Sequence, residues 1–131
     1  MGVVDRRAVK HIDRPGKYDV CEFFSPPRVA PFATARGLRA GWSLDIKTTD
    51  DVTGRKWDLL NPVEREMAFN LLRRDKPHTV TLSPPCTKCC ALLRLSKYGV
   101  DRKSWFEAVR MVNIAVKVAE MQLDGGRHFI F

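Results

Sequence analysis

The residues of this chain best suited to chemistry are a cysteine and the two prolines directly before it. The sequence S-P-P-C at 83–86 ends a short apolar run at 80–82. Such a run, rich in β-branched residues and stopped by proline, predicts a buried strand that leads into a rigid loop. Because proline fixes φ and has no N–H to donate, we expect the loop to hold Cys86 outside the carboxyl end of the strand. A thiolate in that position could act as a nucleophile.

A metal site is the second chemistry that these residues suggest. Cys86, Cys89 and Cys90 offer three thiolates, and His128 could supply a fourth ligand. Strong zinc sites usually contain two separated pairs of ligands, and the second pair is missing here. We therefore favour the nucleophile over a metal. We interpret Cys89 and Cys90 as buried helix residues and Cys21 as a core residue, since free cysteine is among the most buried residue types.

Strands and helices alternate along the predicted structure, and this alternation sets the fold class. Residue patterns predict strands at 18–24, 42–46, 57–60, 80–82 and 127–131, and helices at 31–39, 62–76, 91–95 and about 104–123. Such alternation favours parallel pairing with right-handed crossovers. We therefore expect a Rossmann-like, three-layer α/β/α domain with a mostly parallel sheet of about four to five strands and ligands at its carboxyl edge.

Capping residues mark the starts of the two main helices. Asn61, Pro62 and Glu64 form one start signal, and Ser104 with Glu107 forms another. In the second helix, apolar residues recur at steps of three and four, which predicts a face that packs against the sheet. This predicted face consists of Val109, Val112, Val116, Ala119 and Leu123.

Size and charge limit the class of protein. The 131 residues suit one domain, which we place at 18–131 after a basic, solvated tail at 1–17. The net charge of +8 favours anionic partners, nucleic acid first. We find no segment that suits a membrane span or a signal peptide, and the four cysteines lack the spacing of a disulfide framework. We therefore predict an intracellular protein, cytoplasmic or nuclear.

Several short motifs, taken together, resemble the first half of a cytosine-5 DNA methyltransferase. They are E-F-F-S at 22–25, Asp45 at a strand end, W-D-L at 57–59, S-P-P-C at 83–86 and R-H-F-I-F at 127–131. The resemblance covers residues 18–131. It implies a domain that binds S-adenosylmethionine on a Rossmann-like sheet and uses a cysteine to attack C6 of a cytosine flipped out of DNA.

The resemblance also implies roles for residues that would contact the cofactor. Phe24 and Ser25 would border it, together with Ser83 and Pro84 of the second loop. Asp45 would accept hydrogen bonds from the ribose hydroxyls. The position of Asp45, 20 residues after Ser25, also fits a nucleoside-binding βαβ unit, although an acid at a strand end is equally common as a surface residue.

Further roles concern the adenine ring, the nucleophile and DNA. Asp58 would contact the adenine amine, and Cys86 would be the nucleophile. Lys88, Arg94 and Lys97, in a strongly basic stretch, would hold DNA phosphates without reading the base sequence. The same basic residues could instead form one solvated face of a helix.

Departures from the family predict an incomplete enzyme. Pro26, Pro27 and Arg28 stand where the family has a glycine-rich loop, and Thr87 stands where it usually has glutamine. The glutamate that contacts cytosine, and the target-recognition region, would lie beyond Phe131. We therefore expect a divergent or truncated relative, whose remaining motifs come from a partner chain or from a longer reading frame.

Two other interpretations stay open. An amino-methyltransferase would use Ser83 and a proline carbonyl to bind an exocyclic amine, but Cys86 then stands where that group has a stacking aromatic residue. A non-catalytic basic module would keep the sheet in order to bind nucleic acid or a protein partner. The proline-filled first loop favours this second alternative.

Overall fold

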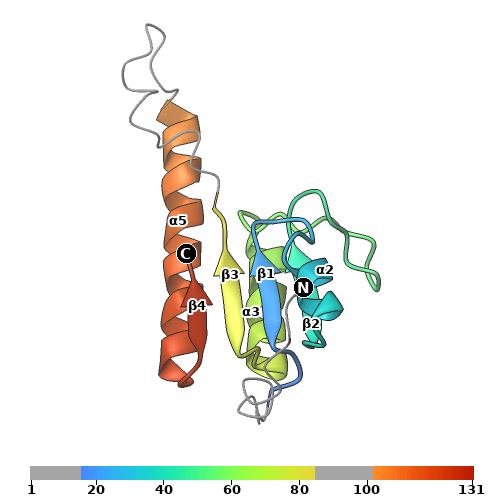
Figure 1. Cartoon of the computed structure of the whole chain (residues 1–131). Coiled ribbons are helices and arrows are strands. Elements are labelled where there is room, and N and C mark those ends of the chain that lie inside the picture. Colours follow the sequence, from blue (N-terminus) through green and yellow to red (C-terminus); the bar gives the residue numbers. More distant parts are fainter. Residues whose placement is uncertain (1–15, 85–101) are drawn as a thin grey trace, which may run out of the picture.

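The computed structural model describes residues 16–84 and 102–131, which form one four-stranded sheet and its helices (Figure 1). The strand order is β2-β1-β3-β4, and all neighbouring strands are parallel. This arrangement confirms the predicted Rossmann-like α/β class. In chain order the elements are β1 (Val20–Phe23), α2 (Ala30–Ala35), β2 (Ala40–Leu44), α3 (Pro62–Asp75), β3 (Thr79–Leu82), α5 (Arg102–Asp124) and β4 (His128–Ile130).

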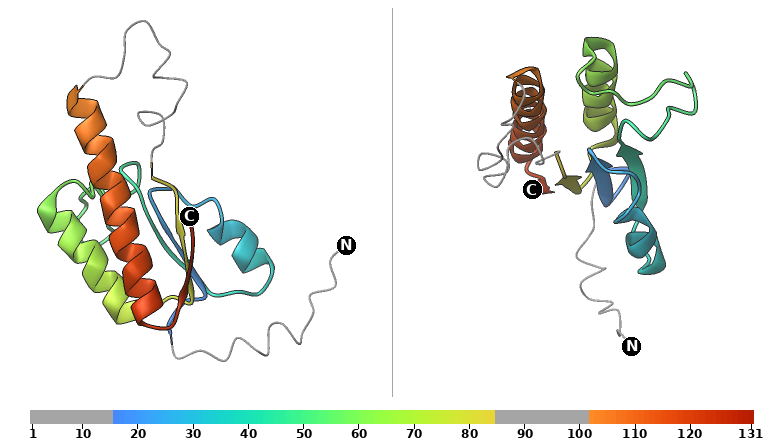
Figure 2. Two further views of the ribbon diagram at one scale, coloured as in Figure 1. Left: turned by 90° about the vertical axis from the view of Figure 1, so that its left-hand side faces the viewer. Right: turned by 90° about the horizontal axis from the view of Figure 1, so that it is seen from above.

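Helices lie on both faces of the sheet, so the domain has three layers (Figure 2). α3 and α5 lie side by side over one face, and α2 lies over the other. A parallel sheet needs such cover because its strands are apolar on both faces. The two-helix face is the more heavily packed one. In α2, Ala33 is the buried residue.

The main hydrophobic core lies between the sheet and the pair of helices α3 and α5. Phe23, Val80 and Leu82 point into it and are at most 2% exposed. Leu72 of α3 and Val118 of α5 belong to the same cluster and are fully buried. Burial of a side chain of this size stabilises a fold by roughly 1.5–3 kcal/mol, so this face supplies much of the hydrophobic stabilisation.

The first helix is shorter than the sequence predicts. α2 ends at Ala35 rather than near residue 39, because the chain turns at Gly37, whose φ of 77° is a left-handed value that favours glycine. The N–H of Gly37 donates to the carbonyl of Thr34 at 3.0 Å and closes the last turn. The early stop leaves room for β2 to begin at Ala40.

The strand predicted at 57–60 is wrong, because this segment is a turn. The N–H of Asn61 donates to the Asp58 carbonyl at 3.0 Å, and the N–H of Leu60 donates to Asp58 Oδ1 at 3.1 Å. Both bonds curl the chain into the start of α3. There Asn61 Oδ1 accepts from the Val63 N–H at 2.9 Å, so the predicted N-cap is confirmed.

The buried face of α5 differs from the predicted one. Val116 and Leu123 are 44% and 60% exposed, so they do not pack on the sheet. The buried residues are instead Ala108, Ile114, Ala115, Val118, Ala119 and Gln122. Three of these are alanines, which bring the helix axis close to the sheet but add little to an apolar periodicity. Neither α5 nor another helix within the described ranges is long and apolar enough to cross a membrane.

Candidate functional site

A buried carboxylate fixes the loop that follows β1. Glu22 is 1% exposed, and its two oxygens accept hydrogen bonds from the N–H groups of Arg28, Val29 and Ala30 at 3.0–3.3 Å. The hydroxyl of Ser43 on β2 donates a further bond at 2.9 Å. Glu22 therefore holds the start of α2 against the sheet. An acid inside an apolar strand was the sequence signal for this role, and our site prediction missed it.

The loop leaves β1 through an unusual backbone conformation at Phe24. Its φ of 61° lies in the left-handed region, which is uncommon for a bulky residue and is often found at functional sites. The Phe24 N–H donates to the Leu44 carbonyl at 2.8 Å, so the turn is anchored to β2. This turn places Phe24 beside the residues that follow β2.

A hollow at the carboxyl ends of β1 and β2 brings together three of the predicted cofactor residues. These are Phe24, from the loop after β1, and Asp45 and Asp58, from opposite ends of the connection between β2 and α3. The complete lining consists of Phe24, Asp45, Ile46, Trp57, Asp58, Leu59 and Met111. The hollow therefore combines two carboxylates with apolar walls.

Both carboxylates keep one oxygen available. Asp45 Oδ2 accepts from the Lys47 N–H at 3.2 Å, and Asp58 Oδ1 accepts from the Leu60 N–H at 3.1 Å. Within the described part of the chain, the other oxygen of each acid accepts no hydrogen bond. Ionised carboxylates are strong acceptors, so the pair suits a ligand that brings hydroxyl or amino donors.

The hollow has a volume of about 60 Å³, which is small beside the roughly 300–1,000 Å³ of most ligand pockets. Trp57 and Leu59 form a buried wall, at 6% and 4% exposed. Ile46 is 53% exposed, and Met111 is a flexible side chain on α5. A nucleoside would therefore enter only after Ile46 or Met111 moves.

The other described residues of the predicted site lie outside this lining. Ser25 is buried, and its hydroxyl donates to the Pro26 carbonyl at 2.8 Å. Ser83 and Pro84 follow β3 at the same edge of the sheet, and the Ser83 N–H donates to the Phe23 carbonyl at 3.1 Å. Ser25 thus belongs to the frame of the loop, whereas Ser83 is exposed.

The remaining predicted residues are Cys86, Lys88, Arg94 and Lys97, and they lie outside the described residues, as do Cys89 and Cys90. Their roles stay predictions from the sequence.

Two residues of the thiol and metal interpretations can be placed. Cys21 is buried, as predicted, and burial raises the pKa of its thiol far above the ordinary value. His128 begins β4 beside His78, with 4.6 Å between the ring centroids. It therefore lies at the amino ends of the strands, whereas Pro84 follows a carboxyl end. The described residues contain no cluster of three or more potential metal ligands.

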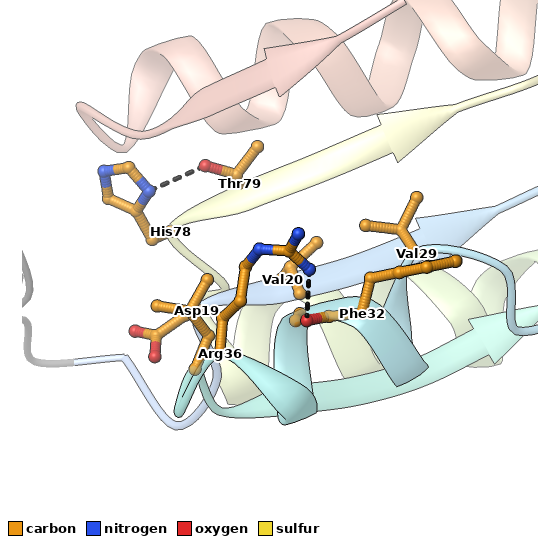
Figure 3. Close-up of a pocket in the computed structure, with 9 residues that line it drawn as sticks. Asp19, Val20, Val29, Phe32, Arg36, His78 and Thr79 are labelled. Atoms are coloured by element: carbon orange, nitrogen blue, oxygen red, sulfur yellow. Dashed lines mark hydrogen bonds between the residues drawn. The ribbon is translucent and has the colours of Figure 1, made fainter. Parts of the chain in front are cut away.

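A larger hollow of about 550 Å³ lies between α2 and the amino-terminal parts of β1 and β3 (Figure 3). Its walls are mostly apolar, and its polar side chains are already engaged. Asp19 pairs with Arg39 at 2.8 Å, His78 contacts the Thr79 hydroxyl at 2.7 Å, and Arg36 donates to the Phe32 carbonyl at 3.3 Å. None of the predicted site residues lines it, so the smaller, acidic hollow is the better candidate for chemistry.

Comparisons with known proteins add nothing to the assignment of a function, which therefore rests on the residues of the chain. No family model, curated protein or solved structure matches this chain.

Proposed function

We propose that the acidic hollow binds the nucleoside part of S-adenosylmethionine in a domain related to cytosine-5 DNA methyltransferases. The observation that supports this proposal is the meeting of Phe24, Asp45 and Asp58 in one hollow. The resemblance assigns these same three residues to the cofactor, and they come from two different connections of the chain. Their position at the carboxyl edge of a parallel sheet is also where such folds bind ligands.

The residues of the hollow suit an adenosine group. Asp45 would accept hydrogen bonds from the ribose hydroxyls, and Asp58 would accept one from the adenine amine. Trp57, Leu59 and Phe24 would exclude water from the ring, which strengthens these bonds. When bound, the cofactor supplies an electrophilic methyl group.

The rest of the chemistry falls to Cys86 and to DNA. The Cys86 thiolate would add to C6 of a flipped cytosine and make C5 electron-rich enough to take the methyl group. Loss of the C5 proton and release of the thiolate would then restore the ring. The base that takes this proton belongs to the part of the site that we expect a partner chain or a longer reading frame to supply.

The structure of the first loop predicts that the two ends of the cofactor contribute unequally to its binding free energy. Pro26 and Pro27 have no N–H, and Glu22 already accepts from the amides at 28–30. Few backbone donors are therefore left for the amino-acid end of the cofactor. We infer that the nucleoside end supplies most of the affinity, so adenosine should bind nearly as well as S-adenosylhomocysteine.

Calorimetry tests the proposal directly. Both ligands should bind the wild-type chain, and Asp45→Asn should weaken each by about tenfold or more, because an amide is a poorer acceptor for the ribose hydroxyls. Asp124→Asn, an exposed acid at the end of α5, is the matched control and should change nothing. Binding that is unaffected by both Asp45→Asn and Asp58→Asn would contradict the assignment.

A non-catalytic basic module is the alternative that a specific observation favours. The closed first loop and the 60 Å³ hollow both suit a sheet that has lost its cofactor. The same titration separates the two: absence of heat with either ligand, in protein that is folded by circular dichroism, leaves the module as the better description. DNA is the expected partner in both cases.

A further inference from the structure

A third hollow, of about 290 Å³, lies between α3 and α5. Figure 2 shows these two helices side by side on one face of the sheet. The lining consists of Arg65, Phe69, Arg110, Asn113, Ile114 and Lys117, which we call the basic groove. It shares no residue with the acidic hollow.

The charge of the basic groove is of one sign. Arg65, Arg110 and Lys117 contribute three cations, and none of the lining residues is acidic. Within the described ranges, none of these three cations forms a salt bridge, whereas the nearby Glu66 is paired with Arg73 at 3.2 Å. The groove therefore attracts anions, and its cations are free to bind them.

One of the cations is held in place by the neighbouring loop. Arg110 Nη2 donates to the Leu60 carbonyl at 3.3 Å. A guanidinium has five N–H donors, so this single bond leaves most of them for a ligand. Arg110 is thus partly preorganised as an anion-binding group.

The floor of the groove offers charge and hydrogen bonds rather than apolar surface. Phe69 and Ile114 are 9% and 7% exposed, so a ligand could bury little apolar area against them. An amphipathic acidic peptide would need such area for its apolar face. Phosphate groups need only cations and N–H donors, which Arg65, Arg110, Lys117 and the Asn113 amide supply.

The same charge continues along α5. Lys103, Arg110 and Lys117 follow one another at intervals of seven residues, or about 10 Å per step at the α-helical rise. Residues seven apart lie on nearly the same side of a helix. Glu107 is the acid within this stretch, so the line stays positive overall. An extended polyanion could contact all three of these cations at once, whereas a compact anion could not.

We propose that the basic groove binds the phosphate backbone of a nucleic acid. This contact does not depend on base sequence, and it goes beyond the cofactor site because it requires neither Asp45 nor Cys86. It gives the +8 chain a defined surface for nucleic acid among the described residues.

Fluorescence anisotropy with a labelled DNA duplex, titrated at several salt concentrations, tests the proposal on the full chain. The groove variant is Arg65→Gln/Arg110→Gln/Lys117→Gln. The matched control, Arg36→Gln/Lys56→Gln/Lys76→Gln, removes the same charge from exposed residues elsewhere. The groove variant should bind at least about tenfold more weakly at low salt, and its slope of log affinity against log salt should fall by about two to three. The affinity of the control variant for DNA should fall by less than about threefold.

Two further measurements keep the result interpretable. Arg65→Gln/Lys117→Gln retains the Arg110 bond to Leu60, and its slope should fall by about two. Circular dichroism must show that each variant is folded. S-adenosylhomocysteine binding should not change in either triple variant, so failure of this proposal and failure of the cofactor proposal are distinguishable.

Two outcomes would overturn the inference. Equal losses in the groove and control variants would mean that net charge alone attracts DNA. Polyglutamate binding that falls as strongly as DNA binding in the groove variant would mean that the groove recognises any polyanion rather than phosphate.

Discussion

Polar side chains at the two ends of the sheet differ in where their hydrogen-bond partners come from. At the amino end, Asp75 accepts from the Trp42 indole at 2.9 Å and from Arg74 at 2.7 Å. Gln122 donates to the carbonyls of Pro77 and His128 at 3.0 and 2.8 Å. At the carboxyl end, among the residues that the structure describes, the carboxylates of Asp45 and Asp58 accept only from N–H groups two residues later in the chain.

The difference separates structural from functional acids. Asp75 and Gln122 are almost fully buried and join elements that lie far apart in the chain. Asp45 is half-buried, and within residues 16–84 and 102–131 its carboxylate bonds only within its own turn. A polar residue whose partners are all supplied by the fold stabilises it, and one with an unused acceptor is available to a ligand. Substitutions at the two ends of the sheet can test this contrast.

The largest expected effect is at the carboxyl end. Cys86→Ser should abolish the covalent adduct with DNA that contains 5-fluorocytosine, because a serine hydroxyl is a far weaker nucleophile than a thiolate. Fluorine at C5 cannot leave as a proton does, so the adduct persists and can be counted on a denaturing gel in the presence of S-adenosylmethionine. Cys89→Ser should keep the adduct. If Cys89→Ser loses the adduct instead, the nucleophile is Cys89. If the wild type also forms no adduct, the non-catalytic module is favoured.

Glu22 should have the largest effect on stability. Glu22→Ala leaves the N–H groups of Arg28, Val29 and Ala30 without their acceptor, so the free energy of unfolding should fall by about 3 kcal/mol or more. Urea unfolding measures this change. Glu66→Ala is the control; this exposed acid pairs with Arg73, and its loss should lower the free energy of unfolding by less than about 1 kcal/mol. Similar losses in both would mean that the first loop does not depend on Glu22.

The next effect compares one acid from each end of the sheet. Asp75→Ala should lower the free energy of unfolding by about 2 kcal/mol, because the buried Trp42 indole loses its acceptor. Asp45→Ala should lower it by less than about 1 kcal/mol while removing nucleoside binding. Denaturant titration and calorimetry on both variants check the pair. If Asp45→Ala proves the more destabilising, Asp45 is a structural residue and the contrast between the two ends fails.

The smallest effect concerns acid pH. The hydrogen bond from Arg74, helped by that from Trp42, holds the pKa of Asp75 below its ordinary value. A carboxyl group of this kind stabilises the fold above its unfolded pKa of about 4, and the contribution is lost as the pH falls through the lower folded value. Between pH 4 and pH 2, the free energy of unfolding of Asp75→Asn should therefore fall by about 1 kcal/mol less than that of the wild type. The difference is small because Arg74 is exposed and its charge is screened. Parallel acid-unfolding curves would contradict this.

Local signals in the sequence predicted several parts of the fold that depend on neighbouring residues, but the start signal at Ser104 and Glu107 was wrong, because α5 already runs from Arg102. The N-cap at Asn61 and the end of α5 near Asp124 follow from side chains within a few positions. The parallel class follows from the alternation of elements. The strand predicted at 57–60 failed because Asp58 bonds its own backbone, and such bonds compete with sheet formation.

The candidate site was predictable only in part, and for a physical reason. Asp45 could be chosen from its place at a strand end and from the family resemblance, and Asp58 from the resemblance alone. Glu22 could be noticed as an acid inside an apolar strand, but its partners could not be predicted, since they are amides six to eight residues later and Ser43 on another strand. The basic groove depends on how α3 packs beside α5, and the alanine-rich buried face of α5 gave little periodic signal for that packing.

The strand order has a consequence for synthesis of the chain on the ribosome. β1 is made first but occupies the interior of the sheet, where it pairs with β2 on one side and with β3 on the other. Until residues 79–82 emerge, a nascent chain can form only the β1–β2 pair of this sheet, so one strand edge and the apolar side of Phe23 face solvent. Such a half-made sheet is a target for chaperones and a hazard for misassembly.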